Sequence, residues 1–119
     1  MVYFTLDNAR ELRKSTLENI EEQAQRIAED LLTQSKTLEE VLDSIRHWIQ
    51  LYPEMNTFVV DVLSHPIVDV GTMVRIRPEK IIPKLRKLLE DKYRDAFPDF
   101  KIERDRDQEF VFCMRVTFH

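Results

Sequence analysis

Cys113 is the only thiol in this 119-residue sequence that could act as a nucleophile. A catalytic cysteine needs a nearby base that is itself oriented by a third group. Cys113 instead lies between Phe112 and Met114, in an alternating apolar stretch where a cysteine is usually buried and unreactive. The sequence also lacks Gly-x-Ser-x-Gly, His-Glu-x-x-His and phosphate-loop patterns. A non-enzymatic protein is therefore predicted.

Two aspartate–histidine pairs have the residue types of metal ligands. Asp43 and His47 are four residues apart, as are Asp61 and His65, and this spacing puts both members of a pair on one helix face. Neither pair has a third histidine or a second cysteine nearby, and Asp43 with His47 points away from the apolar side of its predicted helix. We expect ordinary surface pairs. No metal site and no cofactor are predicted.

Basic side chains gather between residues 71 and 94, which hold eight basic and three acidic residues, a net charge of +5. Residues 1–65 hold six basic and twelve acidic residues, a net charge of −6. A concentrated basic face can bind nucleic acid by displacing counterions from phosphates. The candidate residues are Arg75, Arg77, Lys80, Lys84, Lys87 and Arg94. Asp91 lies at helical spacing from Lys87 and Arg94 and can neutralise part of their charge. The overall charge of −4 also repels a polyanion, so nucleic-acid binding is the alternative function.

An apolar stripe runs along the first predicted helix at alternating three- and four-residue steps. Its members are Leu17, Ile20, Ala24, Ile27 and Leu31. This is the spacing of a coiled-coil seam, but Arg10 and Arg13 occupy the same register upstream, so the apolar part lasts barely two heptads. Packing against the second predicted helix explains the stripe equally well. If the helix projects, the stripe needs a partner, either a second copy or another protein.

The first half of the chain reads as helical. The first helix covers about residues 8–36 and would be about 42 Å long if continuous, so it either projects or breaks near Ser15. Thr37 and Glu40 have capping-box spacing and begin a second helix, which ends at Pro53. Residues 54–65 fit a helical face, although 57–60 have strand-like composition. We predict a short third helix there, and a strand is the open alternative.

The second half reads as mixed. Residues 68–76 alternate as in a strand, Pro83 fits the first turn of a helix, and two strands follow Pro98. The predicted fold is therefore α+β, with an N-terminal three-helix half packed on a small C-terminal β-α-β-β sheet. A short N-terminal edge strand over residues 2–4 is left open. We expect one domain over residues 1–119, helical over 8–65 and strand–helix–strand–strand over 67–118.

Composition sets the expected environment and the function class. A single cysteine cannot form an internal disulfide, which favours a reducing compartment. The start of the sequence lacks a signal-peptide pattern, and its apolar runs are far shorter than the roughly 20 residues that span a bilayer. A cytoplasmic protein without membrane contact is expected. We predict a protein–protein interaction or assembly module that self-associates, or binds another protein, through its first helix. Nucleic-acid binding by residues 75–94 is the alternative, and an uncharacterised enzyme is third.

Overall fold

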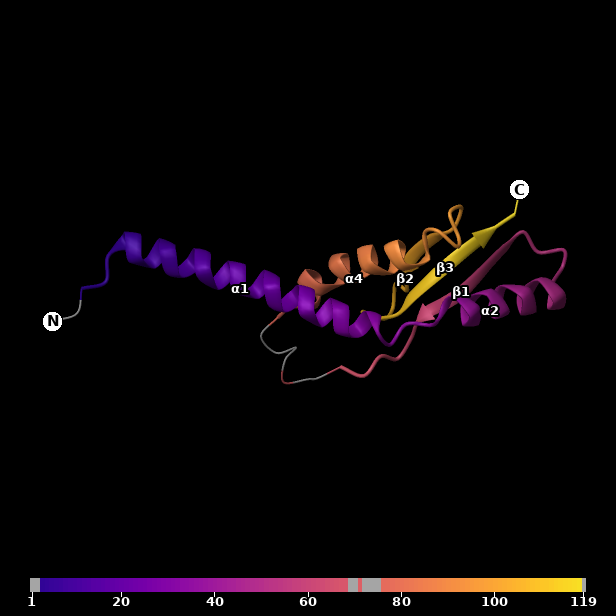
Figure 1. Cartoon of the computed structure of the whole chain (residues 1–119), viewed down its shortest axis with the longest axis horizontal. Helices are drawn as coiled ribbons and strands as arrows, with labels where there is room; N and C mark the ends of the chain where they lie inside the picture. Colours follow the sequence, from indigo (N-terminus) through magenta and orange to yellow (C-terminus); the bar gives the residue numbers. More distant parts are fainter. Residues whose placement is uncertain (1–2, 69–70, 72–75, 119) are drawn as a thin grey trace.

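The computed structural model describes residues 3–68, 71 and 76–118. In chain order, the elements are α1 (Leu6–Leu32), α2 (Leu38–Leu51), β1 (Thr57–Leu63), α4 (Pro78–Tyr93), β2 (Lys101–Arg104) and β3 (Phe112–Thr117). Two helices precede the first strand, and the last two strands end the described chain (Figure 1). The predicted α+β class is confirmed.

The three strands form one antiparallel sheet in the order β1-β3-β2. Across the central strand β3, Phe58 pairs with Val116 and Ile102 pairs with Met114, and all four side chains are buried on one face. The other face is exposed, as at Val59, which is 49% exposed. Since α2 contacts β1 and α4 contacts β2, both helices lie on the buried face. In the described part of the chain the fold has two layers, with helices on one side of the sheet and a second sheet face that no described element covers.

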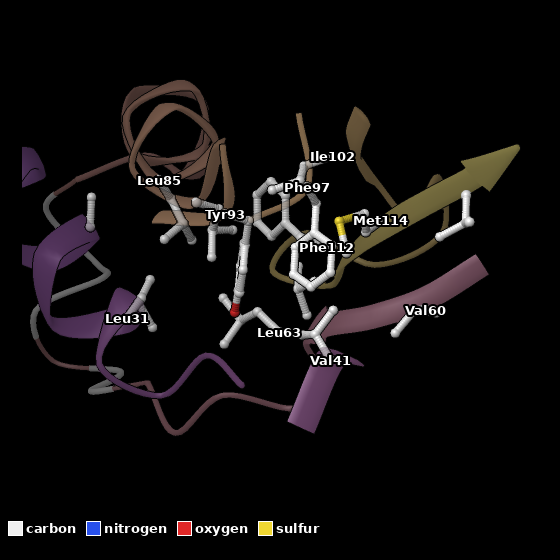
Figure 2. Close-up of a cluster of buried hydrophobic side chains, with 14 of the residues drawn as sticks. Leu31, Val41, Val60, Leu63, Leu85, Tyr93, Phe97, Ile102, Phe112 and Met114 are labelled. Carbon is white, nitrogen blue, oxygen red and sulfur yellow. The ribbon is translucent and has the colours of Figure 1, made fainter. Parts of the chain in front are cut away.

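Tyr93, at the end of α4, joins the core to the connection between α1 and α2. Its ring is 1% exposed and crosses the apolar cluster drawn in Figure 2. Its hydroxyl donates a hydrogen bond to the backbone carbonyl of Lys36, and Lys92 Nζ donates to Ser35 Oγ at 2.6 Å. The Lys36 backbone N–H in turn donates to the Val62 carbonyl at 2.8 Å. The connection is therefore held by α4 and by the end of β1 together.

The C-terminal half of α1 packs beside α4 through small side chains. Ala24 and Ala28 have no exposed surface, and Leu31 is 3% exposed. Small residues at a helix contact allow a short distance between the helix axes. At the start of this contact, the Glu21 carboxylate forms ion pairs with Lys84 Nζ at 2.8 Å and with Lys80 Nζ at 3.4 Å. These contacts hold α1 from about residue 20 onward.

The N-terminal half of α1 has no such support. The helix continues through Ser15 without a break, and every residue from 10 to 19 is exposed. We call residues 6–19 the arm, which is about 21 Å long. The molecule measures 76 × 26 × 23 Å, and its radius of gyration of 19.2 Å exceeds the roughly 13–14 Å of a compact chain of this length. Figure 1 shows the arm extending beyond the body.

The prediction of a third helix over residues 54–65 is wrong, because residues 57–63 form β1. Phe58, Val60 and Val62 alternate into the core while Val59 and Asp61 point outward. The same apolar residues also fit a helical face, and pairing with the distant strand β3 decides between the two.

Two other local predictions concern strands. Tyr3 and Phe4 have no regular structure and are 78% and 68% exposed, so they do not form the edge strand considered for residues 2–4. Val2 lies outside the described residues. The strand expected at residues 68–76 falls mainly on 69–70 and 72–75, which also lie outside them. From β1 onward the described elements are strand, helix, strand and strand, but β1 at 57–63 is not the first strand that was predicted, which was placed at 68–76.

We expect Ala28→Leu to lower the free energy of unfolding by about 1–3 kcal/mol, because a larger side chain separates two closely packed helices. Urea unfolding followed by circular dichroism measures the change. Ala9→Leu makes the same substitution on the arm, where the site is only half-buried, and should change stability by less than about 0.5 kcal/mol. Equal effects of the two substitutions would show that the contact between α1 and α4 is not tight.

Candidate interaction surface on the projecting helix

The face of α1 that packs against α4 continues along the arm. At 100° per residue, Leu6 and Leu17 lie within about 20° of Ala24 around the helix axis. Leu6 is 67% exposed and Leu17 is 50% exposed, whereas Ala24 is fully buried. One continuous apolar stripe is thus covered by α4 at one end and uncovered at the other.

The structure divides the stripe predicted from the sequence into two parts. Ala24 and Leu31 belong to the core, and Ile27 packs against it. Ile20 is half-buried at the boundary, and Leu17 is exposed on the arm. The five residues therefore share a face of α1, but only its N-terminal end is accessible. The spacing could not reveal this division, since it depends on where α4 begins.

Sequence reasoning missed Leu6 and Leu12 as exposed apolar residues of the arm, at 67% and 59% exposure. Leu6 continues the heptad spacing upstream of Arg10 and Arg13, and this register was the available signal. The two arginines lie on the stripe itself. Their aliphatic stems can cover apolar surface while the guanidinium groups stay in water. The arm therefore offers a partner leucines with positive charges between them.

The start of the arm is a well-formed helix end. Thr5 Oγ1 accepts a hydrogen bond from the Asn8 backbone N–H at 3.2 Å. Asp7 lies in the first turn, where a carboxylate interacts favourably with the helix dipole. Its ion pair with Arg10, at 3.6 Å, is highly exposed and contributes little. The charges of both residues remain accessible to a partner.

A second half-exposed apolar surface lies on α2. We call it the α2 seam, and it consists of Leu38, Leu42, Ile49 and Tyr52, which are 37–47% exposed. With the buried Ile45 between them, these residues follow steps of four, three, four and three residues, the spacing of a coiled-coil face. Glu39 and Arg46 border the seam on its solvent side. The periodicity of this helix was evident from the sequence, but the incomplete burial was not.

Aromatic rings support the C-terminal end of the α2 seam. Trp48 stacks on Tyr52 and on Phe58, with ring centroids 5.6 Å and 6.4 Å apart. Phe58 also meets Phe118 edge-on at 5.8 Å. Trp48 and Tyr52 remain 37% and 47% exposed, and aromatic residues of this kind are enriched at protein interfaces. This end of the body is therefore rigid, partly apolar and accessible.

Four residues of the basic segment have acidic partners. Besides the pairs of Lys80 and Lys84 with Glu21, Arg86 pairs with Glu90 and Arg94 pairs with Asp91. The hydrogen bond and charge of Lys84, and then those of Lys80, lower the pKa of Glu21.

Two of the remaining nucleic-acid candidates are exposed and have no acidic partner among the described residues. Lys87 is exposed, and neither it nor Arg77 has an ion pair with any described residue. Arg75 lies outside the described residues. Glu21 comes from α1, so its proximity to the basic residues of α4 could not be read from the local sequence.

Cys113 lies on the uncovered sheet face and is half-buried. Its thiol donates a hydrogen bond to Asp61 Oδ1 at 3.1 Å. Burial, followed by this bond and the nearby negative charge of Asp61, raises the pKa of Cys113 from 9.0 to about 12. A thiol is nucleophilic as thiolate, so this cysteine is a poor nucleophile at neutral pH.

The aspartate–histidine pairs stay apart from any larger set of ligands. Across residues 3–68, 71 and 76–118, no three His, Cys, Asp or Glu side chains gather as a metal site would require. Asp61 is on β1 and His65 follows it with φ 51°, so their four-residue spacing is not helical.

A hollow of about 390 Å³ lies between the end of α4 and β2. Its apolar floor is formed by Tyr93, Phe97, Phe100, Ile102 and Met114. Arg86 and Arg94 at its rim are already paired with Glu90 and Asp91. The residues lining the hollow include no nucleophile with an adjacent base.

No family model, curated protein or solved structure matches this chain. In the described part of the chain, no helix is both long and apolar enough to cross a membrane.

We expect Asp61→Asn to lower the pKa of Cys113, because the substitution removes the negative charge that disfavours the thiolate. At pH about 9 the thiol of the variant should react several-fold faster with iodoacetamide, while burial keeps it slower than a free cysteine. The rate of alkylation against pH, followed by mass spectrometry, measures the shift. Asp99→Asn is the matched control, and an equal acceleration in both variants would contradict the role of Asp61.

We expect no measurable binding to duplex DNA at ~0.15 M salt, because four residues of the basic segment are ion-paired and the chain as a whole has a net charge of −4. Fluorescence anisotropy with a labelled duplex, titrated from low to high salt, is the measurement. Tight binding that falls steeply with salt and is lost in Lys84→Glu with Lys87→Glu would instead support the nucleic-acid alternative.

Proposed function

We propose that this protein is a non-enzymatic assembly module that binds a second copy of itself through the arm. The observation that carries the proposal is the continuation of the buried stripe of α1 onto the exposed arm at Leu6 and Leu17. An apolar helix face that extends beyond its own body is available to another chain. The half-exposed α2 seam supports a second copy as the partner, because the chain itself carries a surface of matching spacing.

The arm has the energetic properties of a contact element. An isolated helix of about 14 residues is marginal in water because its nucleation is unfavourable. Here the packed half of α1 supplies the nucleus, so the arm extends a helix that already exists. Fully burying a leucine side chain contributes roughly 1.5–3 kcal/mol. Covering Leu6 and Leu17 would thus stabilise both the contact and the arm.

The alternative function has less support. Of the six nucleic-acid candidates, Lys80, Lys84 and Arg94 already have acidic partners. For an enzyme, Cys113 is the only thiol, and its raised pKa opposes nucleophilic chemistry.

We expect the mass of the wild-type protein to rise above the 14.3 kDa monomer with increasing concentration. The double variant Leu6→Asp with Leu17→Asp should remain monomeric at the same concentrations, because charges then replace the accessible end of the stripe. Light scattering coupled to size exclusion measures the mass. Both positions are at least half exposed, so circular dichroism should show the fold retained. Ile20 and Ile27 are less suitable because both are partly buried.

The matched control is Ser15→Asp with Asn19→Asp, which adds the same two charges to the opposite side of the arm. This control should associate like the wild type. A wild-type protein that stays monomeric up to the highest concentration would overturn the proposal. Association that survives Leu6→Asp with Leu17→Asp unchanged would overturn the role of the arm.

A further inference from the structure

We propose that the arm of each copy packs antiparallel on the α2 seam of a second copy, so that two equal contacts close a twofold dimer. This inference rests on the proposed function and adds the docking site, the orientation and the symmetry. Three features of the molecule support it, namely the spacing of the two faces, the charges beside them, and the directions of the two helices in the body.

The two faces have the same spacing. On the arm, the stripe positions are Leu6, Arg10, Arg13 and Leu17, separated by four, three and four residues. On α2, the positions are Leu38, Leu42, Ile45 and Ile49, with the same steps. An antiparallel alignment puts Leu6 opposite Ile49 and Leu17 opposite Leu38, and every layer between them stays in register. All four terminal side chains of this alignment are 37–67% exposed and available for the contact.

Charged residues beside the faces favour the antiparallel orientation. In this alignment Asp7 lies next to Arg46 and Lys14 lies next to Glu39, so both flanking pairs have opposite charges. Flanking charges of this kind set the partner and the orientation of paired helices. A parallel alignment forms neither pair. It places Asp7 and Lys14 beside the face of α2 that carries the buried Val41 and packs on the sheet of the same copy. These exposed pairs select the orientation, while burial of the leucines supplies affinity.

The arginines of the arm are also compatible with this site. Arg13 lies opposite Leu42, one residue before Asp43, so its stem can cover the leucine while its guanidinium reaches toward the carboxylate. Asp43 makes only an exposed 3.9 Å contact with Arg46 in the single chain. Both of its oxygens remain accessible to a second copy.

The arrangement of the body leads to the same orientation. In Figure 1, α1 and α2 run in the same general direction, with the arm at one end of the molecule and α2 at the other. A twofold axis perpendicular to the long axis reverses the second copy, so each arm meets the α2 seam of the other copy antiparallel. Both contacts form at once, which closes the assembly as a dimer. The arm and α2 each span about 14 residues, or about 21 Å.

A charge-swap experiment tests the docking site. The full chain is compared with Lys14→Glu, Glu39→Lys and the double variant in low salt, because exposed ion pairs are screened at high ionic strength. Each single variant should weaken the dimer roughly tenfold, since the like-charge contact occurs twice in a twofold dimer. The double variant should return close to the wild-type dissociation constant. Sedimentation equilibrium measures the constants.

The matched control combines Lys14→Glu with Glu54→Lys, which restores the same net charge beyond the opposite end of α2 from Glu39. Rescue by Glu39→Lys but not by Glu54→Lys supports the docking site, and equal rescue overturns it. A third outcome would separate the two proposals. If Leu6→Asp with Leu17→Asp abolishes association but Glu39→Lys does not rescue Lys14→Glu, the docking site is overturned and the proposed function remains. A wild-type protein without any association would overturn both.

A covalent trap gives a second measurement that does not depend on affinity. In a Cys113→Ser background, Lys14→Cys with Glu39→Cys should form a disulfide-linked dimer on mild oxidation, because the two positions lie beside each other only between copies. Ser15→Cys with Glu39→Cys moves the first thiol to the far side of the arm and should form little. Equal yields of linked dimer from the two pairs would contradict the antiparallel alignment.

Discussion

The packing of α1 against α4 at Ala24 and Ala28 positions the other elements of this fold. Two side chains of minimal size and no exposed surface allow the helices to meet closely. The paired helices are then fixed at both ends, by Glu21 with the lysines of α4 and by Tyr93 on the α1–α2 connection. Because this contact involves only half of α1, the other half leaves the body as a rigid continuation. The shape of the molecule follows from where the contact ends.

The two apolar surfaces that remain accessible have different physical origins. The arm is exposed because α4 begins too late to cover it, as the exposure of Leu6 and Leu17 shows. The α2 seam is exposed because α2 rests on β1 through Val41 and Ile45, which leaves its flank at Leu42 open. A stable protein interface usually buries at least about 1,200 Å² in total. Two short helix contacts, repeated by symmetry, are a reasonable way for a domain of this size to reach it.

Local signals predicted much of the fold and little of the site. The capping box at Thr37 and Glu40 marked α2 correctly, as Thr37 Oγ1 accepts from the Glu40 backbone N–H at 3.2 Å. The strand at residues 57–63 was only the alternative to a predicted helix, because its identity depends on pairing with β3, about fifty residues later. The same limit applied to the surfaces. Exposure of the stripe depends on α4, and neutralisation of Lys84 depends on Glu21 from another helix.

The unbroken helix through Ser15 makes the arm and the body mechanically one piece. The direction in which Leu6 projects from the helix axis, relative to the sheet, is therefore fixed by the number of residues between Leu6 and the packed half of α1. Inserting one residue before Ile20 would turn the leucines by about 100°, whereas inserting seven would restore their direction and lengthen the arm by about 10.5 Å. In a reciprocal dimer, such a seven-residue insertion would move the two bodies apart in a fixed increment. The length of the arm can thus change only in steps of about two helical turns if its leucines are to keep their direction, and such a change leaves the core as it is.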